Sequence, residues 1–240
     1  MKKMMISAIS GSLILVFFTF LSSEGLAGVV IEQGVKDSEG RLSKVVLFFS
    51  GDRFRTDHPE SGQTTIIDFG RDRIVLVDHP SKSYVDVKFS LWEKEIAKRL
   101  RQSGLGVKSK QRKITVRKTG DTAIINGFST EKVEVRADGE LIEENWMTRE
   151  VDMKEVERIM EKVATGFTKG FKAEMKEGRE IYEKLKPYGF PLLVKDYTIS
   201  YGLGAMEVLE VKKLERRDLS EDLFSAPKDY RKISPEPARK

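Results

Sequence analysis

The chain has 240 residues, of which 39% are hydrophobic and 34% are charged, so it is long enough to bury a core as one domain. It contains no cysteine, which excludes disulfides, thiol chemistry, cysteine-based metal sites and the lipid-modified cysteine of a bacterial lipoprotein. Lys and Arg exceed Asp and Glu by 43 to 38, and this excess gives only a weak preference for anionic partners such as lipid headgroups.

Residues 1–27 have the pattern of an export signal. Lys2 and Lys3 precede an apolar run over residues 6–21, and small residues at Gly25 and Ala27 fit a signal peptidase site. We therefore expect a cleaved signal and a soluble periplasmic chain that begins near residue 28 and has no transmembrane span. An uncleaved membrane anchor is the less favoured alternative, because the apolar run is short and polar residues follow it at once.

Residues 28–89 predict an antiparallel meander. Short runs rich in Val, Ile, Thr and Phe alternate with turn sequences built from Gly, Pro, Asp and Ser. The expected strands cover residues 28–36, 41–50, 53–57, 63–69, 73–78 and 83–89. Residues 45–49 are apolar at consecutive positions, so this strand is expected to be covered on more than one side or to line a cavity.

A short amphipathic helix is predicted after the meander, over residues 90–103. Ser90 and Glu93 have the spacing of a capping box, and Gly104 stands where a C-terminal cap belongs. The basic cluster over residues 99–113 is typical of a solvated loop, with contact to anionic lipid headgroups as the alternative. Aromatic residues do not alternate with these cations, which argues against nucleic acid as a partner.

The second half of the chain predicts more strands around one long helix. Strands are expected at residues 113–118, 127–137, 140–148, 192–200 and 205–215, and the tail 234–240 is expected to be disordered. The pair Asp138-Gly139 predicts a hairpin turn. Residues 151–186 have the helical period, with Asp152 and Glu155 as reciprocal caps at the start. Each glycine in a helix costs about 1 kcal/mol relative to Ala, so we expect a bend or break near Gly166 and Gly170.

Candidate catalytic residues are scarce. His58 and His79 each precede a proline in an expected turn, where a solvated histidine is the usual case, and no catalytic pattern surrounds them. Glu143 and Glu144 are adjacent on an expected strand, so they point to opposite faces, cannot act as a pair, and at least one should be solvated. We therefore expect no enzymatic activity, no cofactor and no metal site.

Four segments resemble a known family. They are residues 78–84 (DHPSKSY), 119–128 (TGDTAIINGF), 144–147 (ENWM) and 222–230 (DLFSAPKDY). They resemble an uncharacterised family of periplasmic proteins that is similar to the LolA and LolB lipoprotein-sorting superfamily, although this chain lacks the lipidated cysteine of LolB. The resemblance implies one α+β domain over residues 28–233, in which a strongly curved antiparallel sheet forms an open half-barrel and helices cover its concave face. In that superfamily, the apolar cavity between sheet and helices takes acyl chains.

Two functions follow as hypotheses. The first is a carrier or sensor that binds a lipid or lipoprotein acyl chain, and the second is a cell-envelope interaction or stress-sensing module that binds a protein partner and no small ligand. The expected cavity lining is Phe48, Trp92, Trp146, Met160, Phe167, Phe171 and Met175. Apolar residues at such spacing are also typical of an ordinary core, and both tryptophans are expected to be largely buried.

Overall fold

One long sheet, antiparallel except for the parallel pair of β12 (Arg231–Lys232) and β6 (Ser83–Lys88), organises the protein. The computed structural model describes residues 26–37, 39–102, 112–170, 176–197 and 207–234. The strands are β1 (Leu26–Lys36), β2 (Leu42–Ser50), β3 (Arg53–His58), β4 (Gln63–Asp68), β5 (Arg73–Asp78), β6 (Ser83–Lys88), β7 (Ile114–Ile125), β8 (Phe128–Ala137), β9 (Glu140–Thr148), β10 (Phe190–Asp196), β11 (Glu207–Leu219) and β12 (Arg231–Lys232). The helices are α1 (Phe89–Gln102), α2 (Lys154–Gly170) and α3 (Lys176–Leu185), with short 3-10 turns η1 (Lys186–Tyr188) and η2 (Glu221–Phe224).

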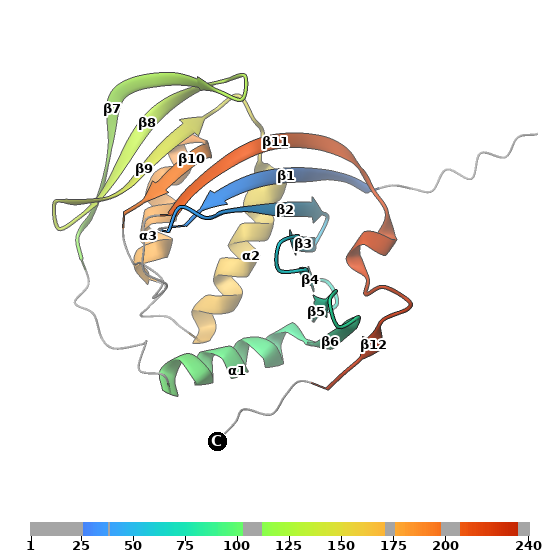
Figure 1. Ribbon diagram of the computed structural model, residues 1–240. Coiled ribbons are helices and arrows are strands. Elements are labelled where there is room, and N and C mark those ends of the chain that lie inside the picture. The colour runs from blue at the N-terminus through green and yellow to red at the C-terminus, as the bar shows by residue number, and fades with distance from the viewer. Residues whose placement is uncertain (1–25, 38, 103–111, 171–175, 198–206, 235–240) are drawn as a thin grey trace, which may run out of the picture.

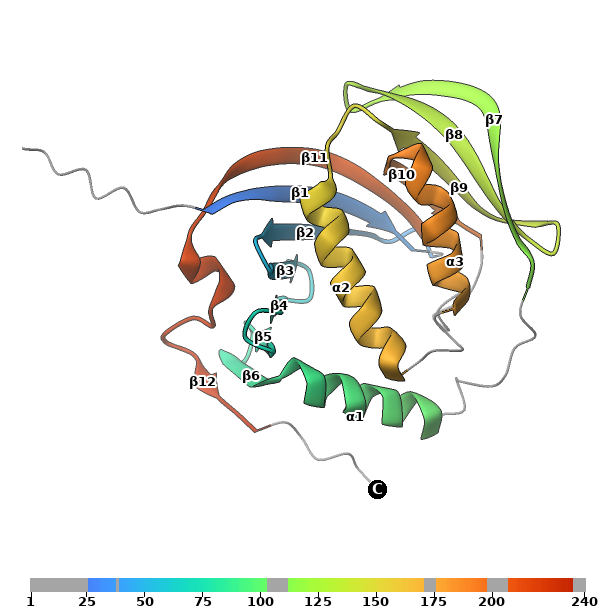
Figure 2. The same cartoon turned by 180° about the vertical axis from the view of Figure 1, so that it is seen from behind.

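The sheet is strongly curved and stays open. Its strand order is β12-β6-β5-β4-β3-β2-β1-β11-β10-β9-β8-β7, so the end strands β7 and β12 do not meet. Strands β1, β2 and β11 arch over the hollow side, α2 crosses it, α1 runs beneath, and α3 lies against β7 to β10 (Figures 1 and 2). Register shifts in β1–β11, β7–β8, β8–β9 and β9–β10 add local bends to the twisted strands. The predicted fold class, an open half-barrel with helices on its concave face, is confirmed.

The expected meander is present, with every strand between residues 28 and 89 found within two residues of its predicted ends. Asp138 and Gly139 both have positive φ, as the predicted tight hairpin requires. β7 is longer than predicted because the chain passes through an irregularity after Lys118 and resumes pairing with β8 at Thr122. β12 was not predicted, since two residues carry no periodic pattern and their pairing with β6 is a tertiary contact.

The predicted long helix is two helices. α2 continues through Gly166 and ends at Gly170, and α3 begins at Lys176. The break therefore comes at the end of the predicted interval. At the α2 start, the Asp152 carboxylate accepts a hydrogen bond from the Lys154 backbone at 3.2 Å. The predicted reciprocal cap by Glu155 is wrong, because its carboxylate instead accepts the Gly51 backbone N–H at 3.3 Å from the turn between β2 and β3.

The α1 start is held by a turn that is distant in sequence. Asp72, between β4 and β5, accepts the backbone N–H of Ser90 at 2.9 Å and its hydroxyl at 2.7 Å. These bonds hold the pKa of Asp72 below its ordinary value, because the hydroxyl and then the backbone N–H favour the charged carboxylate. A carboxylate at a helix N-terminus also satisfies free backbone N–H groups, so this contact fixes α1 to the sheet.

Both faces of the sheet carry a core. On the concave face, α2 buries Met153, Val156 and Ile159 against β1, β2 and β11, and α1 and α3 cover two further clusters. On the convex face, residues from β1, β2, β4 and β5 are buried beneath the C-terminal segment 219–230. The sequence prediction that residues 45–49 are covered on more than one side is therefore confirmed. Their alternate side chains, Phe49 and Phe48, belong to the concave and convex cores respectively.

Polar contacts fasten the C-terminal segment to the convex face. Arg55 donates to the Leu223 carbonyl at 2.7 Å and pairs with Asp57 at 2.8 Å. The Nδ1 atom of His79 lies 2.9 Å from the Tyr230 hydroxyl oxygen, and its Nε2 atom lies 3.0 Å from the Thr64 hydroxyl oxygen. The expectation of two solvated histidines is thus right for His58, which is exposed, and wrong for His79, which joins the sheet to this segment.

Two glycines test the close approach of the backbone at Gly189, just before β10, to β9. Gly189 has φ of 103°, and a Cβ atom there would overlap the Thr148 carbonyl oxygen, whereas Gly127, at φ of 84°, has open space around it. Gly127→Ala should lower the free energy of unfolding by about 1 to 2 kcal/mol, the cost of left-handed backbone. Gly189→Ala should cost distinctly more, since it adds the overlap. Urea unfolding of both variants measures the difference, and equal losses would contradict the close approach at Gly189.

Candidate functional site

The best candidate site is a row of side chains on the concave face. Pairing across β2 to β6 aligns Leu47, Thr56, Thr65, Leu76 and Val85. Each of the five is only partly buried, although all lie on the side of the sheet that the helices cover. Leu47 borders the core beneath α2, and Leu76 borders the core beneath α1. The row therefore joins two helix-covered cores while keeping part of its own surface accessible.

The helices frame this row with apolar and aromatic side chains. Phe89, at the start of α1, contacts Phe69 with ring centroids 5.4 Å apart and stacks with Trp92 at 6.1 Å. On α2, Ile159 is fully buried against the sheet, while its neighbour Met160 is 41% exposed. An exposed methionine beside partly buried aliphatic residues provides a flexible apolar surface. The row consists of three aliphatic residues (Leu47, Leu76 and Val85) and two threonines (Thr56 and Thr65), and together with Met160 of α2 it is called the inner apolar row below.

The seven residues predicted to line a cavity do not share one surface. Met160 and Trp92 lie on the helices of the concave side. Phe167 belongs to α2, but its side chain lies outside the described part of the structure, as do Phe171 and Met175. Phe48 and Trp146 lie on the convex face, so neither borders the inner apolar row. Their alternation with Phe49 and Met147 places them there, because neighbouring residues of a strand point to opposite faces.

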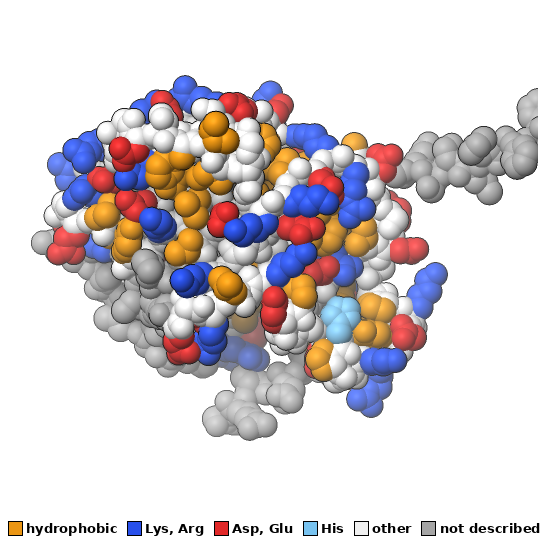
Figure 3. All heavy atoms as spheres, turned by 45° about the horizontal axis from the view of Figure 1, so that its top comes forward, with side chains coloured by type: hydrophobic (Ala, Val, Ile, Leu, Met, Phe, Trp, Pro, Cys, Tyr) orange, Lys and Arg blue, Asp and Glu red, His pale blue; other side chains and the backbone are white. Residues whose placement is uncertain are grey.

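Both tryptophans are partly buried, which does not contradict the prediction that they are largely buried. Trp92 is half-buried at the edge of α1, and Trp146 is half-buried on β9 with the Lys132 ammonium 5.7 Å from its ring centroid. A space-filling view onto the top of the molecule shows hydrophobic side chains between charged ones on this outer side (Figure 3). The sequence pattern of β9 alone could not separate the two faces, because this strand carries apolar residues on both, Trp146 outside and Met147 inside.

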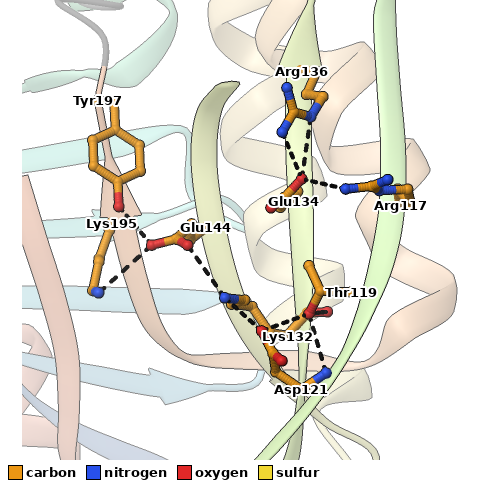
Figure 4. Close-up of polar contacts among 9 residues, drawn as sticks. All are labelled: Arg117, Thr119, Asp121, Lys132, Glu134, Arg136, Glu144, Lys195 and Tyr197. Atoms are coloured by element: carbon orange, nitrogen blue, oxygen red, sulfur yellow. Dashed lines mark hydrogen bonds and ion pairs between the residues drawn. The ribbon is translucent and has the colours of Figure 1, made fainter. Parts of the chain in front are cut away.

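An ordered polar network crosses the outer face of β7 to β10 (Figure 4). Glu144 accepts the Tyr197 hydroxyl and pairs with Lys195 and Lys132, each at 3.5 Å. Glu134 pairs with Arg117 at 3.2 Å and Arg136 at 3.0 Å. Sequence reasoning missed this network, although its alternating charges on neighbouring strands were a usable signal.

Electrostatics differ sharply between the two adjacent glutamates. Glu144 has a side chain that is 15% exposed, and the Tyr197 hydroxyl, followed by Lys195 and Lys132, holds its pKa below the ordinary value. Partial burial and then the hydrogen bond to Glu144 raise the pKa of Tyr197 to about 12. On the opposite face, burial raises the pKa of Glu143, with Asp196 adding to the effect and the Asn145 amide opposing it. The two glutamates do point to opposite faces, but the expectation that one is freely solvated is wrong.

Among the described residues, no group of three or more His, Asp and Glu side chains is placed to hold a metal ion. Within the same residues, no helix is long and apolar enough to span a membrane.

Comparison with known proteins places the chain in a family. The family model described as "Domain of unknown function (DUF4412)" matches residues 32–230. The chain belongs to the DUF4412 family. The search of curated proteins found no match for this DUF4412 chain.

Several solved structures share elements of the DUF4412 fold at low identity. MucB is 10% identical with a TM-score of 0.43, over 87% of this chain and 60% of MucB. The Pseudomonas aeruginosa MucA/MucB complex is 11% identical with a TM-score of 0.43, over 88% of this chain and 59% of the matched chain. A LolA superfamily protein from Nitrosomonas europaea is 9% identical with a TM-score of 0.29, covering 84% of this chain and 91% of that protein. PNGF-II matches with 9% identity and a TM-score of 0.36, and the chain spans only 31% of its length. The chain thus spans less than two thirds of PNGF-II and MucB.

The adjacent glutamates give a paired prediction of pH dependence. Glu143→Gln should raise the free energy of unfolding at neutral pH, because it removes a buried charge whose pKa is raised by burial. That gain should vanish below about pH 4.3, the ordinary glutamate value, where the carboxyl is protonated in both folded and unfolded chains. Glu144→Gln should instead lower stability at neutral pH, and its effect should disappear as pH falls through the depressed pKa of Glu144. Denaturant unfolding of both variants between roughly pH 3 and pH 8 measures these changes in the free energy of unfolding. Changes of the same sign at neutral pH would contradict the buried position of Glu143 and the ion-paired position of Glu144.

Proposed function

We propose that this DUF4412 protein is a non-catalytic periplasmic binding protein that holds an acyl chain of a lipid or lipoprotein against its concave face. The supporting observation is the inner apolar row, whose five side chains remain partly accessible beneath covering helices. Apolar surface left in contact with water costs about 25 cal/mol for each Å², so a hydrocarbon chain that covers it is stabilised. Acyl chains suit such a row because they need burial and no specific hydrogen bond.

The chemistry of the framing helices supports the same ligand class. Met160, 41% exposed on α2, adds a flexible, polarizable apolar side chain on the helical side of the molecule. Phe167, Phe171 and Met175 follow Met160 in the sequence, and their part in the lining stays a prediction. A lipid or lipoprotein would bind through its tail, so the headgroup or the protein part would remain outside the row.

A large side chain introduced into the inner apolar row should block binding of the acyl chain. Leu47→Trp places a large ring on the concave side of β2 and should reduce the affinity for a fluorescent fatty acid at least about tenfold, because the ring takes the volume of the tail. Leu42→Trp is the matched control, because Leu42 is on the same strand and is 75% exposed outside the row. The measurement is a fluorescence titration of purified protein with the fatty acid.

Each outcome of this titration has a defined meaning. Loss of binding in Leu47→Trp with normal binding in Leu42→Trp supports the proposal. Equal affinities for the unmodified protein and both variants would place the fatty acid elsewhere. Absence of binding by the unmodified protein, together with native mass spectrometry that finds no lipid on protein taken from its own cell envelope, would overturn the proposal.

A second candidate is an envelope interaction module that binds a protein partner and no small ligand. The observation in its favour is Trp146, a partly buried ring on the outer face beside the ordered pair of Lys132 and Glu144. Aromatic residues are enriched at the centres of protein interfaces. Trp146→Ser should abolish partner recovery in crosslinked envelope extracts, while Ile124→Ser, at a 79% exposed site on β7, should not. Equal recovery with both variants would remove Trp146 from the interface.

A further inference from the structure

The outward face of α1 differs in charge from the rest of the helical layer. Among the α1 side chains that the structure describes, those that are exposed are Leu91, Lys94, Lys98 and Arg99. Lys88, directly before the helix, is exposed as well. Glu93 of α1 is buried, and Glu95 pairs with Arg99 at 3.2 Å. Asp72 lies close enough to Lys88 and Lys94 for both cations to help the Ser90 hydrogen bonds lower its pKa. We call Lys88, Leu91, Lys94, Lys98 and Arg99 the α1 basic face.

The other two helices lack this asymmetry. The exposed side chains described on α2 include Glu161, and those on α3 include Glu183, each among cations of the same helix. In the sequence, moreover, no acidic residue occurs between Glu95 and Asp121, so the chain that follows the α1 basic face adds cations only. Among the described side chains of the three helices, the exposed set on α1 therefore contains no acid, although the whole chain is nearly balanced.

The orientation of this face is fixed by contacts on the other side of α1. Phe89 is buried against Ile67 and Ile74 of the sheet, and Trp92 stacks on it. The Asp72 carboxylate holds the helix start through the two hydrogen bonds to Ser90. α1 runs along the bottom of the molecule with β11 at the opposite end, so the basic face points away from the arch of the sheet (Figures 1 and 2).

We propose that the α1 basic face docks the protein on an anionic membrane surface. Its charges begin at Lys88, the last residue of β6, and continue through Lys94, Lys98 and Arg99 of α1, and this spread matches a diffuse charged surface better than one acidic peptide. Leu91 is 57% exposed at the centre of these cations, where an apolar side chain can enter the headgroup boundary. Each cation near an anionic leaflet adds attraction, and several together are needed for measurable docking.

Docking through α1 would bring the concave side next to the bilayer. The inner apolar row adjoins the core that α1 covers, since Leu76 packs against Ile67, Ile74 and Phe89. A tail that leaves a bilayer would then have a short path to the row. This membrane contact adds to the proposed binding function and does not depend on it.

Vesicle sedimentation tests the docking surface. The protein is purified from its own cell envelope, so that its N-terminus is the one the cell produces, and is mixed with phosphatidylcholine vesicles with and without phosphatidylglycerol. The double variant Lys94→Glu/Lys98→Glu should bind the anionic vesicles at least about 30-fold more weakly, the fold-change that corresponds to about 1 kcal/mol for each lost cation. Leu91→Ser should weaken binding about tenfold. Salt should weaken the unmodified protein's binding.

The matched control carries the same charge change elsewhere. Lys154, at the start of α2, and Lys212, on β11, are both exposed. Strand β11 lies at the end of the molecule opposite α1 (Figure 1). Lys154→Glu/Lys212→Glu should bind vesicles nearly as well as the unmodified protein. If this control loses binding as strongly as the α1 variant, net charge rather than a docking face is responsible, and the proposal fails.

Two further results would overturn the proposal. Equal binding to neutral and anionic vesicles would remove the role of the cations. Binding to soluble polyglutamate as tight as that to vesicles, unchanged by Leu91→Ser, would assign the face to an acidic protein instead. The fatty acid titration of Lys94→Glu/Lys98→Glu without vesicles should be normal, and Leu47→Trp should still sediment, so failure of docking and failure of acyl binding are distinguishable.

Discussion

The structure depends on a sheet that is apolar on both faces and must be covered on both. Between β1 and β5, consecutive residues alternate between two cores, as Phe48 and Phe49 show. Helices cover the concave core, and the short C-terminal segment covers the convex one. Curvature makes this division possible, because the concave side of an arched sheet encloses helices while the convex side needs only an extended strap. The hydrogen bonds of Arg55 and His79 with the C-terminal segment therefore hold in place the segment that covers the convex core.

Coverage is uneven on the concave side, and this unevenness links the fold to binding. α2 buries its contact with β1 and β2 completely at Val29 and Phe49, and α1 does the same at Ile74. Between these contacts the inner apolar row stays partly open. Two helices that approach the sheet from different directions cannot both pack tightly over the strands between them, so an accessible apolar strip is a geometric consequence of the arrangement. An acyl chain is a ligand that such a strip could hold without further polar groups.

Charge is distributed by face as well. The outer side of β7 to β10 is neutralised by ordered pairs around Glu134 and Glu144, and the partly buried Trp146 lies in this fixed polar frame. On α1, by contrast, the exposed side chains that the structure describes include no acid. The same chain thus offers three different surfaces: an apolar strip inside, an aromatic centre with balanced charges outside, and a basic helix at one end. Binding of a tail, of a protein and of a membrane would use separate parts of the molecule.

The sequence by itself determined the local elements and the class of fold. Period-two runs with turn residues between them placed the meander, Asp138-Gly139 placed a hairpin, and the glycines after Met160 marked where the long helix divides. It could not decide faces or long-range partners, because those depend on the register between strands far apart in the chain. Phe48 and Trp146 look like cavity residues in the sequence but lie on the convex face, and His79 looks like a turn residue but anchors Tyr230. Likewise Glu143 and Glu144 differ in electrostatics only because folding buries one among apolar side chains and surrounds the other with cations and a hydroxyl.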